Sequence, residues 1–370
     1  TSFTKGPFLE TTLPFKDGKT LKELAEAGTI SKEFSKMGKN IHYNDWKLRI
    51  HQEKALEHII NDDRNMVVST GTGSGKTECY LYPIFNEIMR EKENGTLNAG
   101  VRALLIFPMN ALANDQQKKL RKLLADYPDI TFGRYTGETK HAKLKETPED
   151  AEKRMHQEYD VQHQADLDSN SRKSIPNELM CREYMAKKPP HILLTNYAML
   201  EYMLLRPDTA PFFDTEKAKN WKFIVIDEAH TYKGAVGTEI AFLLRRLKER
   251  IRHHRSENFR CIATSATLGS ENGKAELAKF ASQLFGEPFD ETDIITTERQ
   301  KRIPGYNAKD FTVQDYKRIK DELLQLKEEE RGKFLYNKLV NGKRLFKLYD
   351  VLAEKPKDIE EVANYVFSDI

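Results

Sequence analysis

The sequence predicts an α/β domain in which a parallel sheet is covered by helices on both faces, followed by a mainly helical C-terminal extension. Short apolar runs of strand length recur along the chain, and stretches of helical length separate them. The runs are continuously apolar, which is typical of strands that are buried on both faces. These runs are Met66–Val68, Ala103–Phe107, His191–Leu194, Phe223–Ile226 and Cys261–Ala263.

The segments between the runs predict helices, so the order of elements follows the βαβα rhythm of a doubly wound fold. One further short helix is expected near the N-terminus, at Leu21–Ala25, within an otherwise polar stretch. The helices expected between the strands are Gln52–Ile60, Cys79–Glu91, Ala111–Ala125 and Glu239–Ile251.

A charged insertion interrupts this rhythm between about residues 140 and 188. From Lys140 to Asp160, 11 of 21 residues are charged, which favours a solvated segment that is helical or partly ordered. Beyond Gly286 the strand pattern ends, and residues 313–370 predict helices. We therefore expect an N-terminal extension (1–40), a ligand-binding α/β domain (41–290, with the insertion at 140–188) and a helical linker or interaction region (291–370).

The composition narrows the classes of protein to consider. With 60 Lys and Arg against 57 Asp and Glu, the net charge is +3, which argues against a polybasic protein but leaves room for a local basic groove. No apolar run reaches the ~18–20 residues needed to cross a bilayer, and the first residues lack the apolar core of a secretory signal. The three cysteines, at positions 79, 181 and 261, form no CxxC pair, so we expect a reducing cytoplasm rather than a zinc or disulfide framework.

The strongest chemical signal is the glycine-rich loop Thr70–Thr77, which follows a predicted strand and opens a predicted helix. Its glycines let backbone N–H groups approach a phosphate chain, and the helix N-terminus adds positive potential. Lys76 should reach the β- and γ-phosphates, and the Thr77 hydroxyl should bind Mg²⁺. Thr70 stands where the strict pattern has Gly or Ala. The loop residues expected to bind nucleotide are Thr72, Gly73, Ser74, Gly75, Lys76 and Thr77.

A pair of acids, Asp227 and Glu228, directly follows the apolar run Phe223–Ile226, at the edge of the sheet where open α/β folds bind ligands. Phosphoryl transfer needs mainly positioning and charge neutralisation. Asp227 would hold Mg²⁺ and Glu228 would activate the attacking water. A third, weaker signal is Thr264–Thr267, whose hydroxyls follow the next run. These could sense a neighbouring His or a phosphate, or merely cap a turn.

Taken in order, Gln52, the loop TGTGSGKT, the DEAH sequence at 227–230 and the SAT sequence at 265–267 resemble the first RecA-like lobe of superfamily 2 DExH-box helicases. The amino-acid sequence around these motifs is similar to that of a large bacterial group, which contains repair helicases of the MrfA type and anti-phage defence helicases. The resemblance covers about residues 40–290, and the letters DEAH are shared with RNA helicases, so they do not fix the substrate.

The resemblance implies further roles. Gln52 would read the adenine edge of ATP, and His230, Ser265 and Thr267 would couple ATP to movement, with the His230 imidazole bonded to either hydroxyl. Asn110, Arg134, Thr195 and Asn196, each expected just past a strand, would contact the backbone of a nucleic acid. Such contacts position a strand without reading its sequence. ATP and Mg²⁺ are the expected cofactors, and DNA is favoured over RNA.

A complete motor of this kind also needs a second RecA-like lobe, which supplies an arginine finger worth ~10³–10⁵ in rate. After Thr267 the sequence shows no second set of strands and no Gln-x-x-Gly-Arg-x-x-Arg pattern. We therefore expect ATP binding with little turnover from this chain alone, and a second lobe supplied by the rest of the protein or by a partner. The alternatives are an RNA helicase lobe, another P-loop enzyme such as a small-molecule kinase, and a nucleotide-dependent scaffold or binding module.

Overall fold

A computed structural model describes residues 8–9, 13–163, 174–214, 216–252, 259–266, 273–300, 309–340, 342–354 and 357–366. The chain divides into two compact units, one of residues 17–297 and one that combines residues 1–16 with residues 298–370. None of the helices in these ranges is both long enough and apolar enough to cross a bilayer.

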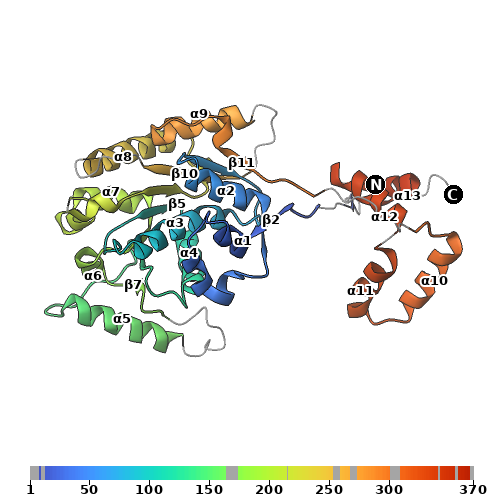
Figure 1. Cartoon of the computed structure of the whole chain (residues 1–370), viewed down its shortest axis with the longest axis horizontal. Helices are drawn as coiled ribbons and strands as arrows, with labels where there is room; N and C mark the ends of the chain where they lie inside the picture. The colour runs from blue at the N-terminus through green and yellow to red at the C-terminus, as the bar shows by residue number, and fades with distance from the viewer. Residues whose placement is uncertain are drawn as a thin grey trace, which may run out of the picture. The chain divides into compact units, whose positions relative to one another are not determined.

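The larger unit is built on an eight-stranded sheet in which all neighbouring strands are parallel (Figure 1). The strand order is β11-β4-β10-β9-β5-β8-β6-β7. The strands are β4 (Met66–Ser69), β5 (Ala103–Phe107), β6 (Phe132–Arg134), β7 (Glu178–Leu179), β8 (Ile192–Asn196), β9 (Phe223–Ile226), β10 (Arg260–Ser265) and β11 (Ile294–Thr296). The five strands predicted from apolar runs are thus confirmed as β4, β5, β8, β9 and β10.

Both faces of the sheet are buried, because successive residues of each central strand enter different cores. On β5, for example, Ala103, Leu105 and Phe107 join one core while Leu104 and Ile106 join the other. The first core is covered by α1 (Leu21–Glu26), η1 (Lys32–Ile41), α2 (Ile50–Ile60), α3 (Lys76–Glu93) and α4 (Asn110–Leu123). The second is covered by α6 (Arg182–Lys187), α7 (Tyr197–Leu205), η3 (Pro207–Phe212), α8 (Gly234–Arg252) and α9 (Gly273–Phe285).

The predicted helices are confirmed with ends that differ by up to five residues, and the predicted α/β class with helices on both faces is correct. Two parts of the sequence prediction differ from the structure. Residues 17–40 are part of the α/β domain rather than an extension of it, because Leu24, Phe34 and Met37 are fully buried in the first core. The strand pattern also continues beyond Gly286, because Ile294–Thr296 pairs with β4 at the sheet edge. A three-residue strand carries too little periodicity to be recognised without its partner.

The charged insertion contains α5 (Pro148–Gln162), β7 and α6. Helix α5 begins regularly, with the Thr147 side chain accepting a hydrogen bond from the Asp150 N–H and Pro148 at the first helical position. The remaining elements of the larger unit are short. They are the antiparallel pair β2 (Asp17–Thr20) and β3 (Lys47–Arg49), together with η4 (Glu216–Asn220), η5 (Ala229–Thr231) and η6 (Glu291–Asp293).

The smaller unit is mainly helical, as predicted for the C-terminal residues. Its helices are α10 (Val313–Leu324), α11 (Glu328–Leu339), α12 (Lys343–Glu354) and α13 (Ile359–Val366). Two very short strands, β1 (Phe8–Leu9) and β12 (Lys357–Asp358), pair antiparallel within it. The first residues of the chain therefore belong to the same unit as the last, which no local sequence pattern indicates.

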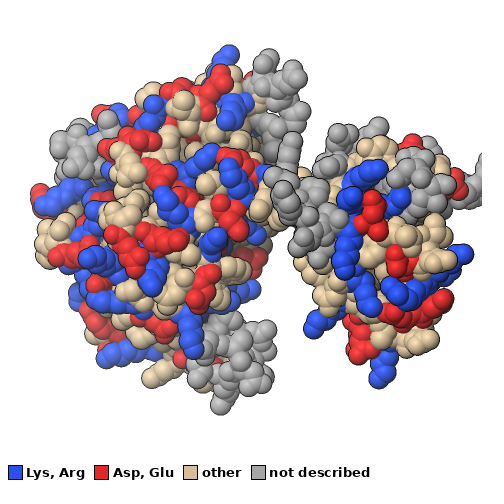
Figure 2. All heavy atoms as spheres, turned by 45° about the vertical axis from the view of Figure 1, so that its right-hand side comes forward, with Lys and Arg blue, Asp and Glu red and all other residues tan. Residues whose placement is uncertain are grey.

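On the face of the larger unit that Figure 2 shows, Lys and Arg are interspersed with Asp and Glu, without a broad area of one sign. This pattern agrees with the nearly balanced composition of 60 basic and 57 acidic residues. On this face, binding would therefore depend on local sites rather than on a broad charge field.

Candidate nucleotide and nucleic-acid site

The phosphate loop follows β4 at the carboxyl edge of the sheet and leads into α3, as predicted. Gly73 and Gly75 have φ values of 71° and 80°, in the left-handed region that glycine tolerates. At Gly75 a β-carbon would also lie 2.3 Å from Gln52 Nε2, so a side chain there would displace the Gln52 amide from the loop. Thr70, which departs from the strict pattern, is buried and its hydroxyl lies 2.6 Å from the Ser74 hydroxyl. The departure thus adds a bond inside the loop.

Three side chains at the start of α2 hold three consecutive carbonyl groups of the loop. Arg49 Nη1 donates to the Gly73 carbonyl at 2.8 Å, and His51 Nε2 lies 2.9 Å from the Ser74 carbonyl. Gln52 Nε2 donates to the Gly75 carbonyl at 3.2 Å, while its Oε1 accepts from the Arg49 N–H at 2.9 Å. With their carbonyls held from behind, the loop N–H groups are left to face a ligand. Of these three residues, only Gln52 has a role predicted from the sequence.

The catalytic groups predicted from sequence lie together. Lys76 Nζ is 3.0 Å from Glu228 Oε1, an ion pair between the phosphate loop and the end of β9. Glu228 has a φ of 49°, which is strained for a residue with a side chain and is common at functional sites. Asp227 is only 8% exposed, and this burial raises the pKa of its carboxyl group above its ordinary range.

Thr264 joins the two acids to β10. Its hydroxyl donates to Asp227 Oδ1, and it accepts from the Glu228 N–H at 3.0 Å. The bond to Asp227 acts against the effect of burial on the Asp227 pKa. The sequence predicts for the Thr264 hydroxyl only that it could sense a His or a phosphate or cap a turn, and does not predict its bonds to the two acids. The register of β9 and β10 pairs Ile226 with Ala263, so their next residues, Asp227 and Thr264, lie side by side.

The oxygen donors near the loop suit Mg²⁺, which prefers hard oxygen ligands and keeps several waters. Thr77 in the first turn of α3 offers a hydroxyl, and Asp227 at the end of β9 offers a carboxylate. Two such ligands are the number that a magnesium ion shared with a polyphosphate takes from the protein. The residues predicted to hold Mg²⁺ therefore fit the ion chemically.

The coupling residues are arranged differently from the bond proposed on the sequence. His230 Nδ1 accepts from the Ala266 N–H at 3.3 Å and lies 3.3 Å from Glu228 Oε2. The Ser265 hydroxyl donates to the Ala266 carbonyl at 3.1 Å rather than to His230. Thr267 lies outside the described residues. The link from motif to motif thus runs through the backbone of Ala266.

Three of the four residues predicted to contact nucleic acid form one cluster over the ends of β5, β8 and β6. Asn196 Nδ2 donates to Asn110 Oδ1 at 2.7 Å, and Asn110 Nδ2 donates to Glu138 Oε1 at 3.1 Å. Arg134 Nη1 donates to Glu138 Oε2 at 2.7 Å. These hydrogen bonds lower the pKa of Glu138. We call Asn110, Arg134, Glu138 and Asn196 the strand-end cluster.

The fourth predicted residue, Thr195, lies inside β8 with no exposed surface, and its hydroxyl donates to the Tyr135 carbonyl at 2.7 Å. Its side chain therefore positions the neighbouring backbone and cannot touch a ligand in this structure. Glu138, which sequence analysis missed as a site residue, connects the cluster. It lies four residues beyond Arg134 in the sequence.

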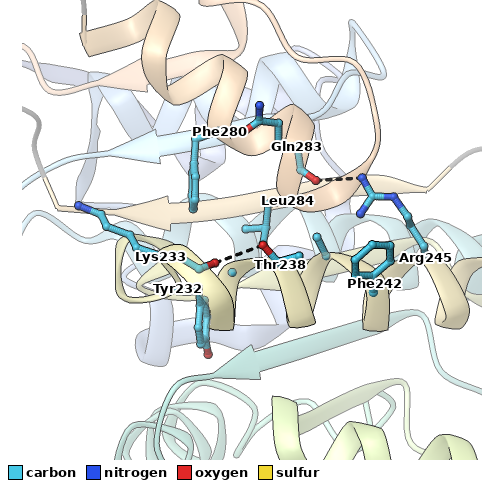
Figure 3. Close-up of a pocket in the computed structure, with 11 residues that line it drawn as sticks. Tyr232, Lys233, Thr238, Phe242, Arg245, Phe280, Gln283 and Leu284 are labelled. Atoms are coloured by element: carbon cyan, nitrogen blue, oxygen red, sulfur yellow. Dashed lines mark hydrogen bonds between the residues drawn. The ribbon is translucent and has the colours of Figure 1, made fainter.

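A separate groove lies between α8 and α9 and has a volume of about 510 Å³ (Figure 3). Phe242 and Arg245 on α8 and Phe280 on α9 line it, and Arg245 Nη2 donates to the Gln283 carbonyl at 3.1 Å. None of the site residues predicted from the sequence lines this groove. The nucleotide site and the strand-end cluster are thus distinct from it.

A phosphate loop, an acidic pair and a hydroxyl-bearing strand at one edge of a parallel sheet define a P-loop nucleotide-binding domain. The sequence matches the DEAD/DEAH box helicase family over residues 49–152 and 144–275. The chain therefore belongs to this family, and the superfamily 2 helicase resemblance of the motifs is confirmed.

Individual proteins also match this chain in sequence. The chain is 32% identical to the Druantia protein DruE of Escherichia coli, over 77% of this chain and 19% of DruE. It is 29% identical to the ATP-dependent helicase YprA of Bacillus subtilis, over 65% of this chain and 25% of YprA. The chain thus spans a quarter or less of the length of these relatives.

Solved structures show the same fold. The DUF1998 helicase MrfA bound to DNA superposes with a TM-score of 0.54 at 25% identity, over 78% of this chain and 32% of MrfA. The DEAD-box helicase Mss116, bound to single-stranded RNA, has the same TM-score at 19% identity, over 78% of this chain and 47% of Mss116. The RecA-like fold predicted from the motifs is confirmed.

Proposed function

We propose that this chain is the ATP-binding motor lobe of a helicase or translocase that acts on DNA. The observation that carries the proposal is the shared sheet edge: a phosphate loop with Lys76 and Glu228 lies at one end, and the strand-end cluster lies at the other. A protein that only bound nucleotide would need the first end alone.

At the nucleotide end, the loop N–H groups and Lys76 would cradle the phosphates, and Gln52 would read the adenine edge. Thr77 and Asp227 would hold Mg²⁺, which would neutralise charge on the phosphate oxygens. In the structure Lys76 is paired with Glu228 at 3.0 Å. A polyphosphate that takes Lys76 would leave Glu228 as a free carboxylate, able to accept a proton from the attacking water.

At the other end, the amides of Asn110 and Asn196 and the guanidinium of Arg134 would bind the phosphates of a single strand. These groups are now bonded to one another and to Glu138, so a strand would replace bonds that already exist. Position along the strand would be fixed without reading the base sequence. His230, Ser265 and Thr267 would transmit ATP binding between the two ends.

The second RecA-like lobe, with its arginine finger, would come from the rest of the protein or from a partner. DNA is favoured as the substrate because MrfA, which this chain resembles at 25% identity, is seen bound to DNA. A role in repair or anti-phage defence, in the cytoplasm, is supported by the similarity of the motifs to that bacterial group. The three cysteines, all buried and free, are compatible with a reducing compartment.

We also propose functional limits for the regions of the chain. Residues 41–290, completed by the short edge strand β11 (Ile294–Thr296), would carry the ATP-binding lobe, and the rest of residues 291–370 would act as a helical linker or interaction region. Of the N-terminal residues 1–40, residues 17–40 would support the lobe rather than bind ligands, because Leu24 and Phe34 fill its core.

The test is the steady-state ATPase rate of the full-length protein with no nucleic acid, with single-stranded DNA and with single-stranded RNA of the same sequence. We expect DNA to stimulate phosphate release and RNA to have little effect. Stimulation by RNA alone would convert the assignment to an RNA helicase. A rate that neither polymer changes would indicate a P-loop enzyme of another kind.

A further inference from the structure

The charged insertion, whose role the motifs leave open, forms one wall of a pocket beside the strand-end cluster. The pocket has a volume of about 350 Å³ and lies between α4, the end of β6 and α5 of the insertion. That volume is within the range of ~300–1,000 Å³ in which proteins bind small organic ligands. Among the residues that line it are Asn114, Arg121, Arg134, Tyr159 and His163.

The pocket continues the path of the proposed strand. Arg134 and Glu138 belong both to the strand-end cluster and to the pocket wall. On α4, Asn114 and Arg121 follow Asn110 at helical spacing, so they extend the same face of the helix. One turn of four residues advances about 6 Å, roughly the reach of one extended nucleotide. A strand bound by Asn110 would therefore bring its next nucleotide to the mouth of the pocket.

Buried hydrogen bonds hold the floor of the pocket in place. Arg121 and Glu178 form a two-pronged ion pair, with Nε and Nη2 each 2.6 Å from a carboxylate oxygen, and Gln117 Nε2 donates to the same carboxylate at 2.6 Å. Arg121 is 2% exposed and Glu178 is fully buried. A buried pair with all its bonds made keeps its geometry, so the pocket does not have to be ordered by its ligand.

The wall supplied by the insertion is aromatic. The rings of Tyr159 and His163 are stacked, with centroids 4.1 Å apart and an interplanar angle of 19°. The Arg121 guanidinium lies 4.5 Å from the Tyr159 centroid and donates to the Tyr159 hydroxyl at 2.6 Å. Flat rings next to a nucleic-acid path are the means by which proteins bind unpaired bases, because every base has a π face.

The charges of the pocket argue for a base rather than for a phosphate. Each of the four cations that line it has a carboxylate partner: Lys118 with Asp115, Arg121 with Glu178, Arg134 with Glu138, and Lys140 with Glu158. Hydrogen-bonding capacity is left over, since within the described part of the chain Asn114 Oδ1 and Arg134 Nε have no partner. Both atoms are covered by protein, and a side-chain rotation would present them to the donors and acceptors of a base edge.

We propose that this pocket receives one unpaired base of the strand held by the strand-end cluster, with the base stacked against the Tyr159–His163 pair. The inference rests on the proposed function, because it needs a single strand along the sheet edge. The insertion would then hold the strand through a base as well as through its phosphates, at a position that tolerates any of the four bases.

The experiment measures binding of the full-length protein to a single-stranded DNA oligonucleotide that carries one abasic site, moved through the sequence one position at a time. We expect one position at which loss of the base weakens binding at least about fivefold. In Tyr159→Leu, which removes the ring but keeps an apolar side chain, this penalty should vanish. In Tyr159→Phe, which keeps the ring and loses only the hydroxyl, the penalty should remain.

A second signal guards against a misfolded variant. In the unmodified protein, 2-aminopurine placed at the sensitive position should be quenched on binding more strongly than at its neighbours. The inference is overturned if intact and abasic oligonucleotides bind equally at every position, or if Tyr159→Leu weakens both to the same degree. Failure of the proposed function looks different, because then even the intact oligonucleotide does not bind.

Discussion

The two ends of the sheet's carboxyl edge are built on different principles. At the β4–β10–β9 end, side chains hold backbone: Arg49, His51 and Gln52 fix three carbonyls of the phosphate loop. At the β5–β8–β6 end, side chains hold one another, as Asn196, Asn110, Glu138 and Arg134 form a chain of bonds. The first end presents a preformed shape to its ligand. The second must exchange partners with its ligand, which suits a contact that is made and broken repeatedly.

The largest expected effect is a loss of ATP hydrolysis when the nucleotide site is changed. Glu228→Gln in the full-length protein should lower ATP hydrolysis by ~10²–10⁴, because an amide cannot accept the proton of the attacking water. Nucleotide binding should persist, since the loop and Lys76 are intact. Unchanged phosphate release in steady state would rule out Glu228 as the base.

Lys76→Ala should weaken ATP binding by two orders of magnitude or more, a loss of about 3 kcal/mol at the loop's phosphate cation. Lys119→Ala is a matched control, because Lys119 also forms one ion pair near the loop, with Glu78 at 2.6 Å. Calorimetry of both variants with ATP and Mg²⁺ checks the prediction. Equal affinities for Lys76→Ala and the parent would contradict the site.

At the strand end, Arg134→Gln should weaken binding of single-stranded DNA several-fold and lower the slope of log affinity against log salt by about 1. Arg246→Gln is the control, because Arg246 on α8 is also paired with a carboxylate, Glu201, and lies outside the cluster. Fluorescence titrations at several salt concentrations give both slopes. If the salt slope of Arg134→Gln equals that of the parent, Arg134 does not contact a phosphate of the strand.

Asp227→Asn should stabilise the protein at neutral pH while it abolishes activity. Burial raises the pKa of Asp227, so the folded state binds its proton more tightly than the unfolded state does. The stability that comes from the protonated acid is present at low pH and is lost as pH rises through the folded pKa. The variant should therefore melt higher than the parent at pH 7, by ~2–4 °C for each kcal/mol gained, and the difference should shrink toward pH 4. A variant that melts lower at pH 7 would show that the charge is favourable there.

The smallest effect concerns the link between the two ends. Ser265→Ala in the full-length protein should keep ATP binding and lower the number of base pairs unwound per ATP by about twofold, whereas a simple turn cap would cost ~1 kcal/mol of stability and leave this ratio unchanged. Unwinding and phosphate release, measured in one reaction, separate these outcomes.

The comparison of the two ends also explains what sequence alone could predict. The phosphate-binding role of Thr70–Thr77 could be predicted because all of its residues lie in one continuous loop. The roles of Asp227 and Glu228 could be predicted because both directly follow an apolar strand. The bonds of Thr264 to the two acids could not be predicted, because they follow from the register between β9 and β10. Other contacts join residues that only the folded chain brings together. These are the bonds of Glu138, the bonds from Arg49 and His51 to the loop carbonyls, and the pairing of β1 with β12.

The ion pair between Lys76 and Glu228 neutralises both groups, since each serves as the counterion of the other. A cellular anion with a single charge, such as a metabolite carboxylate, gains little by displacing Glu228, because it offers Lys76 no more charge than Glu228 already does. A polyphosphate brings several charges to the same point and so outcompetes the carboxylate. The ion pair would therefore favour binding of multiply charged anions over singly charged ones, before any contact with the adenine ring is made.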